Sequence, residues 1–194
     1  MTKTEDPRIL QGIALCYISK IYKIIKSEVL SAEIEGSIDL AIHYLRLARE
    51  KYQLLINRNY GQISDILIMK NYIAVLNSLS DMNLRKHDMY HPGDFTLTEI
   101  ARQCIDEIKS LFDTIDLIYD DHPTYSATEF EIEYYEALHY YQSVEMSKAH
   151  QKIVNARARI NLLKSIPNCD KYVDELFLQK ESSLNDLELH MQKH

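Results

Sequence analysis

Apolar side chains recur along this chain at spacings of three and four residues, over stretches long enough for several helical turns. One such stripe consists of Ile38, Ala41, Leu45 and Ala48. Two further stripes follow the same rule, and their residues are Ile66, Met69, Ile73, Leu76 and Leu79, then Ile100, Cys104, Ile108 and Phe112. Apolar positions with this spacing share one face of an α-helix, whereas strands alternate with a period of two. No stretch of useful length alternates, so the pattern predicts an all-α protein.

Proline and glycine are scarce, with four of each in 194 residues, and they fall between the apolar stripes. Both residue types interrupt helices. Asp6-Pro7 has the form of an N-cap followed by proline at the first helical position. Further breaks are expected at Gly36-Ser37, Asn59-Tyr60-Gly61, His91-Pro92-Gly93 and Pro167-Asn168. The helices predicted between these breaks are residues 8–32, 37–57, 62–84, 96–119, 127–145, 147–165 and 169–191.

Two segments have the spacing of a capping box, in which a hydroxyl residue is followed three positions later by glutamate. They are Thr96-Leu97-Thr98-Glu99 and Ser126-Ala127-Thr128-Glu129. In a capping box the hydroxyl accepts a hydrogen bond from the third backbone amide, and the glutamate reaches back to the cap. We therefore expect two helices to begin at Thr96 and Ser126.

Short connections between consecutive helices predict antiparallel hairpins, within one helical-hairpin domain that spans residues 1–194. The second helix of each pair carries a stripe of large and small residues in a fixed order. Ile38, Ala41, Leu45 and Ala48 form one copy, Met146, Ala149, Ile153 and Ala156 a second, and Thr98, Ala101, Ile105 and Ile108 a looser third. In this stripe the chain resembles the tetratricopeptide (TPR) repeat superfamily.

The resemblance implies about three stacked hairpins in a right-handed superhelix, with a concave groove lined by the first helix of each pair. Ala137 and Tyr140 fall at the family's small and aromatic positions, and Gly36 falls where the family often turns. Two features depart from the family: Ala32 stands at an aromatic position, and the connection 85–95 is long. An irregular helical bundle, with no true repeat, remains the alternative architecture.

The resemblance also implies that the last predicted helix caps the stack. Its apolar face consists of Tyr172, Val173, Leu176, Phe177, Leu184, Leu187 and Met191. Its charged residues, expected in solvent, are Glu175, Lys180, Glu181 and Asp186. Such a face could instead serve self-association.

Tyrosine is unusually frequent, with 14 residues against four phenylalanines and no tryptophan. Tyr134, Leu138 and Tyr141 share one face of the helix predicted at 127–145, with Gln142 beside them. By resemblance these residues would line the groove, together with Lys23 and Lys26 of the first helix and Lys70 and Asn71 of the third. A tyrosine combines a flat apolar body with a hydroxyl group, which suits an anchor for a peptide or helix. We therefore expect a non-catalytic scaffold or adaptor whose partner is another protein.

The net charge is −7, and it is unevenly distributed. Residues 1–58 carry nine bases and seven acids, residues 59–125 five bases and eleven acids, and residues 126–194 eight bases and eleven acids. This balance disfavours non-specific binding to nucleic acid, and the acidic middle third would attract a basic segment. The helix at 147–165 is locally basic, through Lys148, Lys152, Arg157, Arg159 and Lys164. Its bases could bind an acidic partner, or balance acidic neighbours such as Glu133 and Glu136. The groove, the acidic third and the basic helix are thus three candidate binding faces.

Three dispersed cysteines, Cys16, Cys104 and Cys169, do not make a disulfide framework, which favours an intracellular, cytoplasmic or nuclear location. No run of 18 apolar residues is present to span a membrane, and the first residues lack the apolar core of a secretory signal. We expect no membrane association.

Few residues suggest chemistry. Arg85 and His91 have a spacing similar to the Arg…His pair of a helical RNase family, so an RNA-cleaving enzyme is one alternative function. However, Pro92 should end the helix that such a pair needs. His87, Asp88 and His91 are one ligand short of a metal site, and Glu136-x-x-His139 is only half of a di-iron motif. We expect no catalytic residue, metal or cofactor. A subunit of an obligate complex, with apolar helix faces covered by other subunits, is a further alternative.

Overall fold

The structure is a computed structural model that describes residues 6–25, 32–58, 64–114, 123–167, 169, 173 and 175–191. Every regular element in these ranges is a helix, so the predicted all-α class is confirmed. The helices are α1 (Pro7–Ile25), α2 (Ala32–Arg58), α3 (Ser64–Met89), α4 (Phe95–Thr114), α5 (Pro123–Gln142), α6 (Met146–Ser165) and α7 (Glu175–Met191). None of them is both long enough and apolar enough to cross a membrane.

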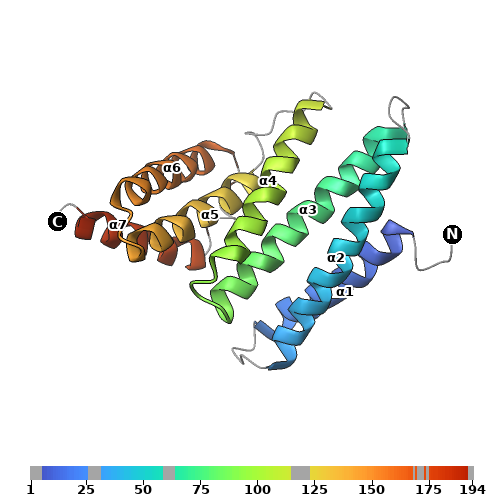
Figure 1. Ribbon diagram of the computed structural model, residues 1–194, viewed down its shortest axis with the longest axis horizontal. Helices are drawn as coiled ribbons and strands as arrows, with labels where there is room; N and C mark the ends of the chain where they lie inside the picture. The colour runs from blue at the N-terminus through green and yellow to red at the C-terminus, as the bar shows by residue number, and fades with distance from the viewer. Residues whose placement is uncertain are drawn as a thin grey trace.

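Consecutive helices pack as pairs, α1 with α2, α3 with α4, and α5 with α6. The pairs are stacked in chain order, because α2 packs on α3 and α4 packs on α5. Figure 1 shows this order as a row from the blue α1–α2 pair to the orange α5–α6 pair. The odd-numbered helices are also neighbours of one another, since α1 contacts α3 and α3 contacts α5. The last helix, α7, lies against both α5 and α6.

The large and small stripes of the second helices form the contacts within this stack. Ile38, Ala41, Leu45 and Ala48 of α2 have no exposed side-chain surface, and Ala149 and Ala156 of α6 are equally buried. Small residues at such positions let neighbouring helices approach closely, and the large ones fill the space between them. The predicted core face of α2 is therefore correct, and that of α6 is correct except for Met146, which is exposed at the start of the helix.

The predicted break at Gly36-Ser37 is wrong, because both residues lie inside α2, which begins four residues earlier at Ala32. Ile34 is fully buried, so the first turn of α2 adds a side chain to the core. Glu33 and Glu35 place negative charge at the positive end of the helix dipole. Together these contributions outweigh the cost of one glycine in a helix, which is about 1 kcal/mol.

Both predicted capping boxes are also wrong. At the start of α4 the cap is Asp94, whose Oδ1 accepts a hydrogen bond from the Thr96 amide at 3.0 Å. Ser126 lies inside α5, which begins at Pro123, a favoured first helical residue. At the start of α1, by contrast, the predicted cap is confirmed, because Asp6 Oδ1 accepts from the Arg8 amide at 2.9 Å.

The connection between α3 and α4 is shorter than predicted. Helix α3 continues to Met89, so His87 and Asp88 belong to its last turn and not to a surface loop. The predicted break at His91-Pro92-Gly93 is confirmed, and Gly93 has φ +99°, a conformation that side chains with a Cβ rarely adopt. The predicted break at 59–61 lies outside the described residues.

A row of buried carboxylates on α5 is paired with bases from both neighbouring helices. Glu133 and Glu136 lie next to Arg102 of α4, at 2.6 and 2.9 Å, and Lys152 of α6 lies 2.5 Å from Glu136. Glu129, one turn earlier, lies 2.9 Å from Arg159 of α6. Buried charges are tolerated when they are paired. The basic face of α6 is thus engaged within the protein, in agreement with the interpretation that it balances Glu133 and Glu136.

Candidate functional site

Two cavities open on the side of the stack formed by the odd-numbered helices. The first cavity, of about 370 Å³, lies between the end of α3, the turn after it, α5 and α7. The second cavity, of about 320 Å³, is lined by residues of α1, α3, α5 and α7. Cavities of this size are at the lower end of the range for small-ligand sites. The first is lined by His87, Asp88, Pro92, Gly93, Phe95, Tyr134, Tyr135, Leu138, His139, Gln142, Gln179, Lys180 and Ser183.

Lys180 of α7 lies between the two cavities. Its side chain is only 6% exposed, and its Nζ lies 3.1 Å from Glu131 Oε1 and 3.8 Å from Asp88 Oδ2. Glu131 lines the second cavity, whereas Asp88 and Lys180 line the first. The ammonium group also lies 5.0 Å from the centre of the Tyr135 ring, which is within range of a cation–π interaction. The prediction that Lys180 is in solvent is therefore wrong, because carboxylates of α3 and α5 and an aromatic ring surround its charge.

Tyr135 makes a hydrogen bond to one of the carboxylates beside Lys180. Its hydroxyl donates a hydrogen bond to Asp88 Oδ1 at 2.9 Å, which links α5 to the last turn of α3. Burial is the main cause that raises the pKa of Tyr135, and the nearby Glu131 and Asp88 carboxylates raise it further. The hydroxyl therefore stays protonated and acts as a donor at neutral pH.

His87 is the second buried polar residue of the first cavity, at 7% exposed. The Gly93 amide donates to its Nε2 at 3.2 Å, so Nε2 must be the unprotonated nitrogen. The proton of the neutral ring is then on Nδ1, which is buried and has no hydrogen-bond partner. Burial lowers the pKa of His87 below its ordinary value of 6.5, which keeps the ring neutral at pH 7.

The second cavity holds a polar contact between α1 and α3. The Tyr22 hydroxyl of α1 donates to Asp81 Oδ2 of α3 at 2.5 Å, and Arg85 Nε lies 3.4 Å from Asp81 Oδ1. Burial and the Asp81 carboxylate raise the pKa of Tyr22, which keeps its hydroxyl protonated as the donor. This contact gives the second cavity a more polar wall than the first.

Three of the four residues predicted on α5 line the first cavity, and one does not. Tyr134, Leu138 and Gln142 line the first cavity, whereas Tyr141 is half-buried against the core and does not line it. Tyr134 is only 8% exposed, and its ring packs against those of Phe130 and Tyr135. It therefore contributes to the core as well as to the cavity wall.

The predicted residues of the first and third helices lie away from the two cavities. Lys23 is exposed and borders a shallow depression on α1 with Leu15, Cys16, Ser19, Lys20 and Ile24. Lys70 is exposed on α3, seven residues before Asn77 of the second cavity, and so lies on the same side of the helix. Asn71 is half-buried and lines neither cavity. Lys26 lies outside the described residues.

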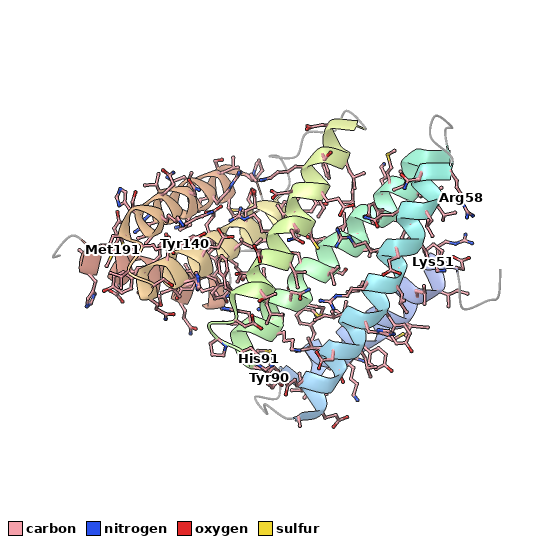
Figure 2. All side chains as sticks on the ribbon, in the orientation of Figure 1. Lys51, Arg58, Tyr90, His91, Tyr140 and Met191 are labelled. Carbon is pink, nitrogen blue, oxygen red and sulfur yellow. The ribbon has the colours of Figure 1, made fainter. Side chains whose placement is uncertain are left out.

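Arg85 and His91, the residues of the RNase alternative, have separate partners. Arg85 pairs with Asp81 on α3, whereas His91 Nε2 lies 3.0 Å from Glu35 Oε1 in the first turn of α2. Figure 2 labels His91 and Tyr90 beyond the end of α3, beside this part of α2. Over the ranges that the structure describes, no three His, Cys, Asp or Glu side chains converge as metal ligands would.

Sequence reasoning missed His87 and Lys180, the two residues that give the first cavity its polar character. A signal for Lys180 was present, because it lies on the same helical stripe as Phe177, Leu184 and Leu187. A basic residue at an apolar position indicates a buried partner. His87 carries no comparable signal, because its burial depends on where α3 ends.

Fold and site together define an all-α protein of stacked helix pairs with two cavities along one side. Comparison adds no relative to this description: no protein-family model, no curated protein and no solved structure matches the chain.

Proposed function

We propose that this protein is a non-catalytic scaffold that binds a peptide or helix of a partner protein along the side formed by α1, α3, α5 and α7. The observation that carries the proposal is that the first and second cavities open on this side, the first bordered by α3, α5 and α7 and the second by α1, α3, α5 and α7. The two cavities, with Lys180 and its carboxylate partners between them, suit successive side chains of an extended or helical segment.

The proposal includes a TPR-like arrangement, in which the first helices of successive pairs line a concave face of a right-handed superhelix. It is supported by the contacts of α1 with α3 and of α3 with α5, and by the buried stripes of α2 and α6. In this arrangement α7 acts as a cap, because Phe177, Leu184 and Leu187 are buried in the stack. The cap also supplies one wall of the first cavity, through Gln179, Lys180 and Ser183.

The chemistry of the first cavity supports a protein ligand. Aromatic and aliphatic groups, Phe95, Tyr134 and Leu138, lie beside the exposed amides Gln142 and Gln179. Apolar anchors with a few polar groups are typical of sites that bind protein segments. We also propose an intracellular location, which the free thiols of Cys16, Cys104 and Cys169 support.

A subunit of a larger complex is a second candidate, favoured by the outer side of α1. Ile9 and Leu15 are 42% and 45% exposed there, on the first helix of the row. In such a complex another helix would cover this side. The two functions are compatible, because the outer side of α1 and the first cavity are formed by different helices.

The proposed binding face can be tested with two matched double variants and a random peptide library displayed on phage. Peptides are selected on the native protein, and the affinity of the tightest ones is measured by calorimetry. Gln142→Arg/Gln179→Arg should weaken binding at least about tenfold, because the new side chains occupy the mouth of the first cavity. Gln103→Arg/Gln151→Arg adds the same charge at exposed positions of α4 and α6, and should leave the affinity within about twofold.

Tyr134→Ala is a poorer probe, since the buried ring would leave a gap in the core. If both double variants weaken binding equally, or if neither does, the odd-numbered helices are not the binding face.

A further inference from the structure

We propose that the first cavity binds a neutral amide of the partner, either a backbone peptide group or the side chain of Asn or Gln. Its carbonyl oxygen would accept hydrogen bonds from His87 Nδ1–H and from the Lys180 ammonium. The inference rests on the proposed function in one respect, namely that the amide belongs to a partner protein. The cavity itself is defined independently, by the buried groups that line it.

Two donors in the wall of the first cavity have no hydrogen-bond partner. They are Nδ1 of His87 and Nζ of Lys180, and both side chains are more than nine-tenths buried. The contacts of Lys180 with Glu131 and Asp88 have the distances of ion pairs but not the geometry of hydrogen bonds. A buried donor without an acceptor is unfavourable, so an acceptor placed here would stabilise the complex.

The two donor residues are neighbours of the same aromatic ring. The His87 ring lies 4.3 Å from the Tyr135 ring, centre to centre, and Lys180 Nζ lies 5.0 Å from the centre of the same ring. Tyr135 and both donor residues line the first cavity. The proposal places one planar group in this cavity, beside Tyr135 and between the two donor residues.

The charges around the first cavity select a neutral ligand. The wall of the first cavity holds one positive charge, Lys180, and one carboxylate, Asp88, and His87 is neutral at pH 7. Glu131, on the far side of Lys180, also interacts with the charge of Arg85. A carboxylate or phosphate would therefore meet the carboxylate of Asp88, and a cation would leave both donors unpaired. An amide carries no charge and offers an acceptor and a donor together.

The donor half of the amide also has a place in the cavity. Asp88 Oδ1 is occupied by the Tyr135 hydroxyl, whereas Asp88 Oδ2 has only the 3.8 Å ion pair with Lys180. The N–H of a bound amide could donate to Oδ2. The rest of the ligand would lie against Phe95, Tyr134 and Leu138, which form the apolar part of the wall.

Three probes that share a leucine side chain test the charge selection. They are N-acetyl-L-leucine N-methylamide, which is neutral, N-acetyl-L-leucinate, an anion, and L-leucine N-methylamide, a cation. Each is titrated into protein labelled in its leucine methyl groups, and the shift of the Leu138 methyl resonances is followed. The neutral probe should give a saturable shift with an affinity at least about fivefold higher than either charged probe.

Two variants test the donors. His87→Phe keeps a ring but removes the Nδ1–H, and should weaken the neutral probe at least about tenfold. His150→Phe, an exposed position on α6, is the matched control and should change the affinity less than twofold. Should His87→Phe fail to fold, the Nδ1 proton of native His87 is followed instead. Its exchange with water should slow when the neutral probe binds.

Equal affinity for the anion, no saturable shift at Leu138, or no change in His87 exchange would each overturn the inference. The outcomes are separable from those of the proposed function. If displayed peptides bind the face and His87→Phe does not change their affinity, the scaffold proposal stands and the amide site is rejected. If the neutral probe binds and no displayed peptide does, the amide site stands and the scaffold proposal is rejected.

Discussion

At the scale of single residues, the first cavity is lined by two buried polar side chains, Lys180 and His87, and neighbouring groups stabilise the first better than the second. Lys180 has two carboxylates and an aromatic ring beside it, so its charge is compensated inside the protein. His87 has one hydrogen bond, from the Gly93 amide, and an unpaired Nδ1–H. His87 therefore lowers stability in the free protein unless a ligand satisfies it, as is common for residues of binding sites.

The lowered pKa of His87 predicts a specific pH dependence of stability. The unfolded chain takes up a proton at His87 near pH 6.5, whereas the folded chain does so only at lower pH. Between these two values the unfolded state binds more protons, so the free energy of unfolding falls as the pH falls. Chemical denaturation from about pH 7.5 to 5 should therefore show a smaller loss of stability in His87→Gln than in the native protein. A constant difference between the two proteins across this range would show that burial of His87 has no such effect.

At the scale of helices, apolar periodicity located every element, and the errors arose where local signals compete with packing. Gly36-Ser37 resembles a break, yet the burial of Ile34 extends α2 through it. Ser126 resembles a cap, yet it is buried within α5. Such outcomes depend on contacts with other helices, which a single stretch of sequence does not contain. The start of α1 and the break after α3, by contrast, are marked locally, by Asp6-Pro7 and by Gly93. The turn between α5 and α6 carries no such mark, because it is made of Ser143, Val144 and Glu145.

The two glycines give a matched test of this distinction. Gly36 is exposed within α2 and an added Cβ would meet nothing within 4 Å, so Gly36→Ala should raise the free energy of unfolding by about 0.5–1 kcal/mol. Gly93 has equally open surroundings but φ +99°, so Gly93→Ala should lower it by about 1–3 kcal/mol. Thermal and denaturant unfolding would measure both. Opposite signs are required; a loss of stability in Gly36→Ala would mean that Gly36 is needed for a turn after all.

At the scale of the whole molecule, ion pairs join α5 to the even-numbered helices on either side of it. The carboxylate row of α5 is enclosed by bases of α4 and α6, which ties the last two pairs together. Two of the buried polar atoms without a hydrogen-bond partner, His87 Nδ1 and Lys180 Nζ, belong to residues that line the first cavity. The order of the helices could be predicted from sequence. The site could be predicted only in part, because it combines α5 residues on a recognised face with α3 and α7 residues that tertiary contacts bury.

The central claim is that the partner segment lies along the side formed by α1, α3, α5 and α7, and the most direct measurement is a backbone amide NMR titration with the tightest displayed peptide. The account predicts that the largest shifts fall in the last turn of α3 around His87, in α5 from Tyr134 to Gln142, and in α7 from Gln179 to Ser183. Shifts confined to α2, α4 and α6, or to the outer side of α1, would contradict it.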